Sequence, residues 1–216
     1  MSTEAVDTTR PDANRDNPLR RLRLALWALA LLGLCLFGLL WLRQMAATTP
    51  ALPNYGSLPS FALLDQRGTT VTLDDLEGTP WIADFIFTSC PGVCPILTER
   101  MAVLDSELPS DAVRLVSFSV DPERDRPEVL AEYAAKHDAS ARWTFLTGTQ
   151  SEIESLVRDG FMLPLDPSPR EEGLEPIVHS NRFVLVDADG HLRGFYNAFD
   201  AEALKALRRD LQQLVD

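Results

Sequence analysis

Two cysteines separated by three residues constrain this chain more than any other feature. Cys90 and Cys94 follow an apolar run of strand character, 81–87, and they open a run of helical character. Pro95 suits the first helical position, where its missing N–H costs nothing, so we expect Cys94 at about the N-cap. The positive end of the helix dipole would then face both sulfurs and lower the pKa of each thiol. The spacing therefore predicts two reactive or metal-ligating thiols, with a short structural disulfide as the alternative.

An uncharged apolar stretch of 19 residues, from Leu24 to Leu42, precedes these cysteines. At about 1.5 Å per residue it just covers a hydrocarbon core about 30 Å thick, so it predicts a single transmembrane helix. Five arginines lie before the stretch, whereas Arg43 is the one basic residue close behind it. By the positive-inside rule, the N-terminus is cytoplasmic. We therefore expect a single-pass protein of the inner (cytoplasmic) membrane whose large C-terminal part is periplasmic or otherwise extracytoplasmic, where cysteine pairs can be oxidised.

Two other interpretations of the N-terminal region stay open. A signal peptide could be cleaved near Ala46 and Ala47, although the apolar run exceeds the roughly 7 to 15 residues usual for such a signal. A lipoprotein signal could end at Cys35, although Leu34 before it is a poor fit to the small residue that this processing requires. Otherwise Cys35 is a small apolar residue in lipid.

Composition divides the chain into four parts. They are a polar, disordered cytoplasmic N-terminus at 1–19, a transmembrane anchor at 20–43, a tether rich in small residues and proline at 44–57, and a folded domain at 58–216. The last part is long enough for one domain with a sizeable core. The net charge of −12 comes from 32 acidic and 20 basic residues. Because nucleic-acid binding needs a basic footprint, this balance argues against a nucleic-acid partner.

Within the folded part, the apolar pattern alternates between strand and helix periods. The expected elements are a hairpin at 61–73, a strand at 81–87, a helix at 96–108, a strand at 113–120, a helix at 127–137, a strand at 143–146, a helix from the Thr149–Glu152 capping box to 159, a hairpin at 183–196 and a last helix capped by Asp200. This order is typical of an α/β protein. A thioredoxin-like sheet with an added N-terminal β-hairpin accounts for all of it.

In such a sheet, ligands gather at the carboxyl ends of the strands. The loop with Cys90 and Cys94 lies there, Asp121 ends the next strand on the same side, and His179 opens the strand before the last hairpin. Two thiolates and one imidazole form a soft ligand set that favours Cu(I), with Cu(II) also possible. Structural zinc would require a fourth protein ligand, and none is obvious. The alternatives are a hydrogen-bonded structural role for His179 and a simple strand end at Asp121.

Three motifs, in order along the chain, carry a resemblance to a known family. They are FTSCPGVCP at 87–95, SFSVDPERD at 117–125, and His179-Ser180 leading to VDADG at 186–190. With them the chain resembles the Sco/SenC family of thioredoxin-fold copper proteins that help to assemble cytochrome c oxidase. The resemblance covers about 55–215 and the anchor.

The resemblance implies that Cys90, Cys94 and His179 bind copper and that Asp121 occupies an outer position, supporting the ligands or recognising a partner. One residue departs from the family pattern, because the family often has aspartate before the histidine where this chain has Val178. Without an acidic neighbour the histidine loses a possible orienting contact, which predicts a lower copper affinity while leaving the redox role in place.

The function expected from this resemblance is delivery of copper to, or reduction of cysteines in, the copper site of a respiratory oxidase subunit. That subunit is the expected partner, with other copper chaperones or thiol reductants as further candidates. The rival hypothesis is an enzyme, a thiol-disulfide oxidoreductase without a metal, which would use Cys90 and Cys94 but not His179. A peroxidase fits less well, because the thiols are too close together to match a distant resolving cysteine. We expect His137 and His191 to be structural.

Overall fold

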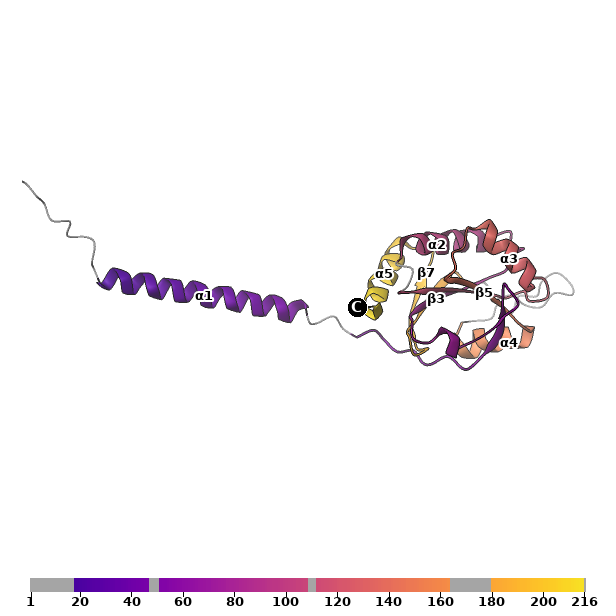
Figure 1. Ribbon diagram of the computed structural model, residues 1–216, viewed down its shortest axis with the longest axis horizontal. Helices are drawn as coiled ribbons and strands as arrows, with labels where there is room; N and C mark the ends of the chain where they lie inside the picture. The colour runs from indigo at the N-terminus through magenta and orange to yellow at the C-terminus, as the bar shows by residue number, and fades with distance from the viewer. Residues whose placement is uncertain (1–17, 47–50, 109–111, 164–179, 216) are drawn as a thin grey trace, which may run out of the picture. The chain divides into compact units, whose positions relative to one another are not determined.

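The structure is a computed structural model that describes residues 18–46, 51–108, 112–163 and 180–215 (Figure 1). The chain divides into two units between residues 51 and 52. In the first unit, helix α1 (Pro18–Ala46) is long and apolar enough over Pro18–Leu42 to cross a membrane. It contains the stretch that the sequence predicts to span the bilayer.

The second unit is built on a seven-stranded sheet with the order β2-β1-β5-β4-β3-β6-β7. The strands are β1 (Ala62–Asp65), β2 (Thr70–Thr72), β3 (Trp81–Ile86), β4 (Arg114–Ser119), β5 (Trp143–Thr147), β6 (Arg182–Val186) and β7 (Leu192–Asn197). The three central strands β3, β4 and β5 are parallel, and antiparallel hairpins extend the sheet at both edges. This is the predicted α/β sheet, with the N-terminal hairpin added at one edge.

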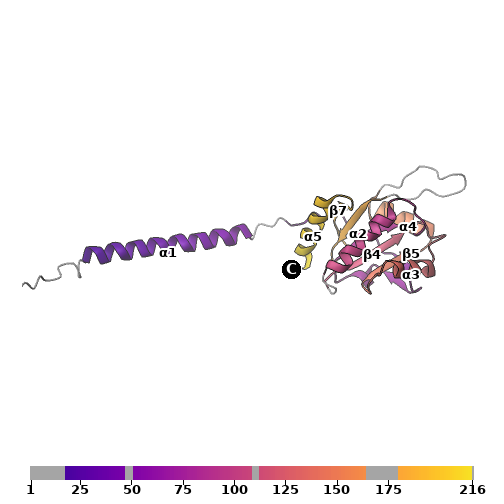
Figure 2. The same cartoon turned by 90° about the horizontal axis from the view of Figure 1, so that it is seen from above.

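Helices cover both faces of this sheet. They are α2 (Cys94–Glu107), α3 (Pro127–Lys136), α4 (Gln150–Ser155), which continues as a π-helical turn (Leu156–Gly160), and α5 (Ala201–Val215), with a short 3-10 helix at Asp74–Leu76. Helices α2 and α3 lie on one face and α4 on the other (Figure 1), and the view from above shows α2 and α3 in front of the strands (Figure 2). The predicted capping box of α4 is present. The predicted cap of α5 is also present, since the Glu202 N–H donates to Asp200 Oδ1 at 2.9 Å.

An aromatic cluster fixes the central strands. Phe85 of β3 stacks on Phe118 of β4 with 5.6 Å between ring centroids, and Phe161 packs edge-on against Phe85 at 4.9 Å. All three side chains are buried. Burying a large aromatic side chain contributes about 1.5 to 3 kcal/mol relative to leaving it exposed, so this cluster holds β3 and β4 firmly. The loops at the carboxyl ends of these two strands therefore start from a rigid base.

The residues just before β1 run along the opposite edge of the sheet, beside β7. The Tyr55 N–H donates to the Leu192 carbonyl at 2.9 Å, and the Leu192 N–H donates to the Gly56 carbonyl at 2.8 Å. Ser57 forms an isolated antiparallel bridge with His191. Part of the segment predicted as a tether is therefore held against the domain.

Candidate metal centre

The two cysteines lie on the connection from β3 to α2, at the carboxyl edge of the parallel strands. Cys90 is 9% exposed and Cys94 is 3% exposed, and both are free thiols. Helix α2 has Val93 as its N-cap, and Val93 already has helical torsions (φ −80°, ψ −28°). The predicted helix start is thus wrong by one residue, because Cys94 is the first helical residue and Pro95 the second. The helix still begins at the sulfurs, as the sequence predicts.

The Cys90 sulfur lies where several hydrogen bonds favour its ionised form. Burial raises the pKa of the Cys90 thiol, but the Cys94 thiol and the backbone N–H groups of Cys94, Gly92 and Val93 donate to it, and together they lower its pKa. Hydrogen bonds to a charged form stabilise that form. Cys90 is therefore the more readily ionised thiol of the pair, in agreement with the prediction for this residue.

Cys94 behaves in the opposite way. Burial raises its pKa most, donation of its proton to Cys90 raises it further, and the charges of Cys90 and Asp84 add to the effect. A backbone hydrogen bond from Phe87 opposes these effects but is outweighed. The prediction of a lowered pKa at both thiols is thus wrong for Cys94, because desolvation exceeds the effect of the helix end. The reduced pair can share one proton between two sulfurs, and a metal that binds both must displace it.

A buried carboxyl group lies in the strand that leads to the cysteines. Asp84 of β3 is fully buried opposite Ser117 of β4, and neither of its carboxyl oxygens has a hydrogen-bond partner within the described residues. Burial raises the pKa of Asp84 to about 7, while the nearby Ser117 hydroxyl lowers it by less. In the sequence, Asp84 is a lone aspartate inside an otherwise apolar strand, a signal that the sequence prediction leaves unassigned.

A hydroxyl pair joins the start of α2 to α3. Thr98 Oγ1 donates to the Cys94 carbonyl at 2.9 Å and lies 2.8 Å from the Tyr133 hydroxyl. Burial raises the pKa of Tyr133 to about 12, with Asp84 and the two cysteines adding to the shift. Tyr133 therefore stays neutral and acts as a hydrogen-bonding support for the first turn of the cysteine helix.

The turn after β4 carries two aspartates with different partners. Asp121 is 6% exposed and forms an ion pair with Arg124 at 3.0 Å. Asp125 is fully buried, and its carboxylate accepts hydrogen bonds from the Thr88 N–H (2.9 Å), the Thr88 hydroxyl (2.5 Å) and the Ser119 hydroxyl (2.6 Å). The sequence prediction singled out Asp121, and Asp125 appeared there only as part of a motif. In the fold, Asp125 is an aspartate whose side chain bonds the cysteine loop directly.

The predicted third ligand, His179, lies outside the described residues. The described chain resumes directly after His179, at Ser180. Ser180 and Asn181 lead into β6, which pairs antiparallel with β3. Because these strands run in opposite directions, the start of β6 lies at the carboxyl end of β3, the end from which the cysteine loop leaves. The place of His179 beside the thiols stays a prediction.

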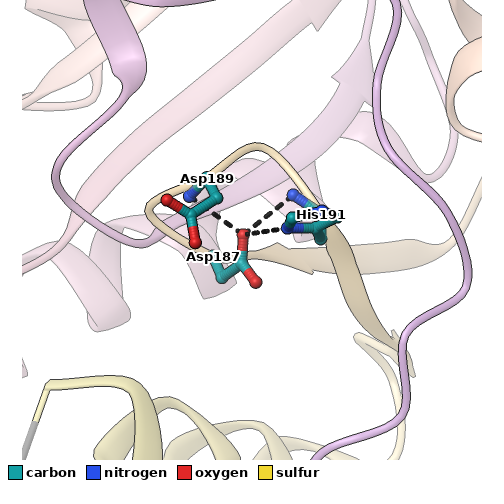
Figure 3. Close-up of side chains that lie close together, drawn as sticks. All are labelled: Asp187, Asp189 and His191. Carbon is teal, nitrogen blue, oxygen red and sulfur yellow. Dashed lines mark hydrogen bonds and ion pairs between the residues drawn. The ribbon is translucent and has the colours of Figure 1, made fainter.

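A second group of potential ligands lies in the turn between β6 and β7 (Figure 3). Ligand atoms of Asp187, Asp189 and His191 lie within 4.8 Å of one another. However, Asp187 Oδ1 accepts the N–H groups of Asp189 (3.0 Å) and His191 (2.8 Å), and Asp187 Oδ2 lies 3.3 Å from Arg193. Asp187 thus closes the hairpin turn through its backbone partners, and its carboxylate already forms an ion pair with Arg193. This arrangement agrees with a structural role for His191.

Comparison with known proteins places these features in a family. The family model SCO1/SenC matches residues 52–216. The SCO1 protein homolog of Bacillus subtilis (strain 168) is 40% identical over 151 residues, covering 68% of this chain and 76% of that protein. A putative copper-binding protein of Stutzerimonas stutzeri is 33% identical over 168 residues, covering 76% of this chain and 80% of that protein.

Solved structures agree with the sequence relatives. BsSco, a member of the Sco family of cytochrome c oxidase assembly proteins with a disulfide switch, superposes with a TM-score of 0.65 at 36% identity, covering 76% of this chain and 95% of that one. ScoI of Arabidopsis thaliana with copper bound superposes with a TM-score of 0.62 at 27% identity, covering 73% of this chain and 99% of that one. The match over the whole second unit and the level of identity lead to one conclusion: this chain belongs to the SCO1/SenC family.

Proposed function

We propose that this chain is a membrane-anchored copper-binding protein that acts in assembly of the copper site of cytochrome c oxidase, as a metallochaperone or thiol redox factor. The observation that carries the proposal is the pair of free, buried thiols of Cys90 and Cys94 at the carboxyl edge of the sheet. Two similar proteins support it: the Stutzerimonas stutzeri relative is described as a putative copper-binding protein, and the Arabidopsis thaliana ScoI structure contains bound copper.

The proposed copper ligands are Cys90, Cys94 and His179. Two sulfurs and one imidazole nitrogen suit Cu(I) and also allow Cu(II). Because the pKa of Cys94 is raised, binding through both sulfurs releases a proton, and copper affinity should rise with pH. Asp121 is proposed as a partner-recognition residue, since its ion pair with the half-exposed Arg124 brings charge to the surface near the site.

The proposed topology follows from the charges that flank the membrane segment. Residues 1–19 would be cytoplasmic, 20–43 would anchor the chain in the inner membrane, 44–57 would connect to the bilayer, and 58–216 would lie in the periplasm or an equivalent compartment. There the domain could meet the copper-bearing subunit of the oxidase. Other copper chaperones or thiol reductants of that compartment are further candidate partners.

A second candidate function, thiol-disulfide exchange without a metal, is favoured by a specific observation. The pKa of Cys90 is lowered whereas the pKa of Cys94 is raised. Such an asymmetric pair provides a ready thiolate and a neighbouring protonated thiol, which is what exchange through a mixed disulfide uses. This chemistry requires no imidazole, so His179 separates the two functions.

The test replaces His179 with alanine, with His191→Ala as the matched control from the hairpin turn. In cells that depend on this chain for their oxidase, His179→Ala should prevent assembly of the copper site, because copper loses a ligand. The purified His179→Ala chain should still exchange thiols at the wild-type rate. His191→Ala should preserve both activities. If His179→Ala cells assemble the oxidase normally and assembly fails only when the cysteines are replaced, the copper-binding function is wrong. The function is then thiol-disulfide exchange without a metal.

A further inference from the structure

We infer that Asp125 is a positioning residue, which holds the cysteine loop in the arrangement that lets Cys90 and Cys94 close on one copper ion. The inference rests on the proposed function and adds a residue to its site. Asp125 is fully buried, so its carboxylate is held by protein hydrogen bonds. It belongs to the turn after β4, whereas Cys90 belongs to the loop after β3 and Cys94 begins α2.

The contacts of this carboxylate concentrate on one residue of the cysteine loop. Asp125 Oδ2 accepts the Thr88 N–H at 2.9 Å, and Asp125 Oδ1 accepts the Thr88 hydroxyl at 2.5 Å. Thr88 stands two residues before Cys90. Because both donors of Thr88 go to the two oxygens of one carboxylate, the orientation of its backbone is fixed as well as its position. Hydrogen bonds to a charged acceptor are roughly twice as strong as neutral ones, which makes this a firm attachment.

The carboxylate is itself held from the other side. The Asp125 N–H donates to the Asp121 carbonyl at 2.9 Å, which closes the turn. The Ser119 hydroxyl donates to Asp125 Oδ2 at 2.6 Å and accepts the Asp121 N–H at 3.2 Å. The end of β4, the turn and the start of the cysteine loop therefore form one hydrogen-bonded unit.

This attachment acts on the cysteine that the helix does not hold. Cys94 is the first residue of α2, whose inner face is buried in the core through Leu97 and Met101. Cys90 lies in the loop, where its N–H donates to the Phe87 carbonyl at 3.2 Å. Without the attachment at Thr88, the Cys90 side of the pair would be held by the bonds within its own loop alone, while Cys94 would stay fixed by the helix.

Two equilibria depend on the sulfurs staying adjacent. Copper binding through both thiolates and closure of the Cys90–Cys94 disulfide each require the two sulfurs together, and prior ordering of the loop reduces the entropy that either process loses. Removing the attachment should therefore weaken both. Partners that orient metal ligands typically change metal affinity by about 10-fold to 100-fold when they are lost.

The chain contains a matched control for the general effect of losing such a carboxylate. Asp105, near the far end of α2, accepts the Ser140 N–H at 2.9 Å, the Ser140 hydroxyl at 2.7 Å and Arg142 Nε at 2.8 Å. Both aspartates thus bind the N–H and hydroxyl of one residue, but only Asp125 binds a residue of the cysteine loop. Asn at either position keeps the shape and replaces one acceptor oxygen with an amide nitrogen.

The experiment compares Asp125→Asn and Asp105→Asn in the full chain in detergent. Copper affinity is measured by competition with a Cu(I) chelator, the disulfide equilibrium constant against a glutathione buffer, and stability by thermal unfolding. Both variants should lose stability. We expect Asp125→Asn to lower copper affinity by about 10-fold or more and to lower the disulfide constant, whereas Asp105→Asn should leave both within about twofold.

Thr88→Val removes only the hydroxyl bond and should lower the same two constants by smaller factors, so the test survives if Asp125→Asn does not fold. Wild-type values for both constants in Thr88→Val, or in a folded Asp125→Asn, would overturn the inference. If the wild-type chain binds no copper, the proposed function fails, and the disulfide constant still decides whether Asp125 positions the loop.

Discussion

Replacing Cys94 with alanine should lower the copper affinity of the reduced chain by more than about 100-fold, which is the upper end of the effect of removing a partner that only orients a ligand. The remaining thiolate and imidazole leave a soft ion undercoordinated. Although the pKa of Cys94 is raised, Cys94 still serves as a ligand, because copper binding displaces the proton from its thiol. Competition titration with a Cu(I) chelator at several pH values would measure the loss.

Cys90→Ala should weaken binding to a similar degree. The matched control is Cys35→Ala, which removes the cysteine of the other unit and should leave the affinity unchanged. Wild-type affinity in either Cys90→Ala or Cys94→Ala would show that the ion is held elsewhere.

Replacing Asp84 with asparagine should stabilise the domain at alkaline pH. The pKa of Asp84 is raised by burial from 3.8 to about 7. Between these values the unfolded chain ionises this group while the folded chain keeps it protonated, so wild-type stability falls as pH rises, and the loss is complete above about pH 7. A shift of about three pKa units corresponds to ~4 kcal/mol at 1.36 kcal/mol per unit. The stability difference between Asp84→Asn and wild type should therefore grow by about that amount from pH 4 to pH 8.

Urea unfolding of residues 52–216 under reducing conditions would measure this difference. The control is Asp65→Asn, because Asp65 is also fully buried but accepts the Thr69 N–H, the Arg67 side chain and the Arg67 N–H, which outweigh burial and lower its pKa. Its stabilising effect is present above the ordinary pKa of aspartate and is lost as pH falls. Asp65→Asn should thus be destabilising, most of all at high pH. A stability difference for Asp84→Asn that stays constant across this range would show that Asp84 does not carry the raised pKa.

The order of helices and strands is predictable from the sequence, because burial of one or both faces of each element sets the spacing of its apolar residues. The apolar run at 81–87 has the composition of a strand covered on both faces, and β3 is indeed buried at every residue. The capping residues Thr149 and Asp200 act locally, so their helix starts are also predictable. The pairing of residues 55–58 with the β7 side of the sheet was not predictable, because it uses backbone groups that any sequence provides.

The candidate site was predictable to the extent that it depends on residue type and strand ends. The paired cysteines at the start of a helix required only the local pattern. The contrast between the two thiols required knowledge of burial, which opposes the helix dipole at Cys94 and is outweighed at Cys90. Asp125 meets the cysteine loop across a turn that its own N–H closes on the Asp121 carbonyl, and a motif alone does not say which of its two aspartates bonds that loop.

The most direct test of the account is the coordination of copper in the reduced wild-type chain. X-ray absorption at the copper edge, with copper quantified per chain, should find about one ion with two sulfur ligands and at least one imidazole nitrogen. The same spectrum of His179→Ala should retain both sulfurs and lose that nitrogen. A site with fewer than two sulfurs in the wild type, or a spectrum that His179→Ala leaves unchanged, would contradict the proposed copper centre of Cys90, Cys94 and His179.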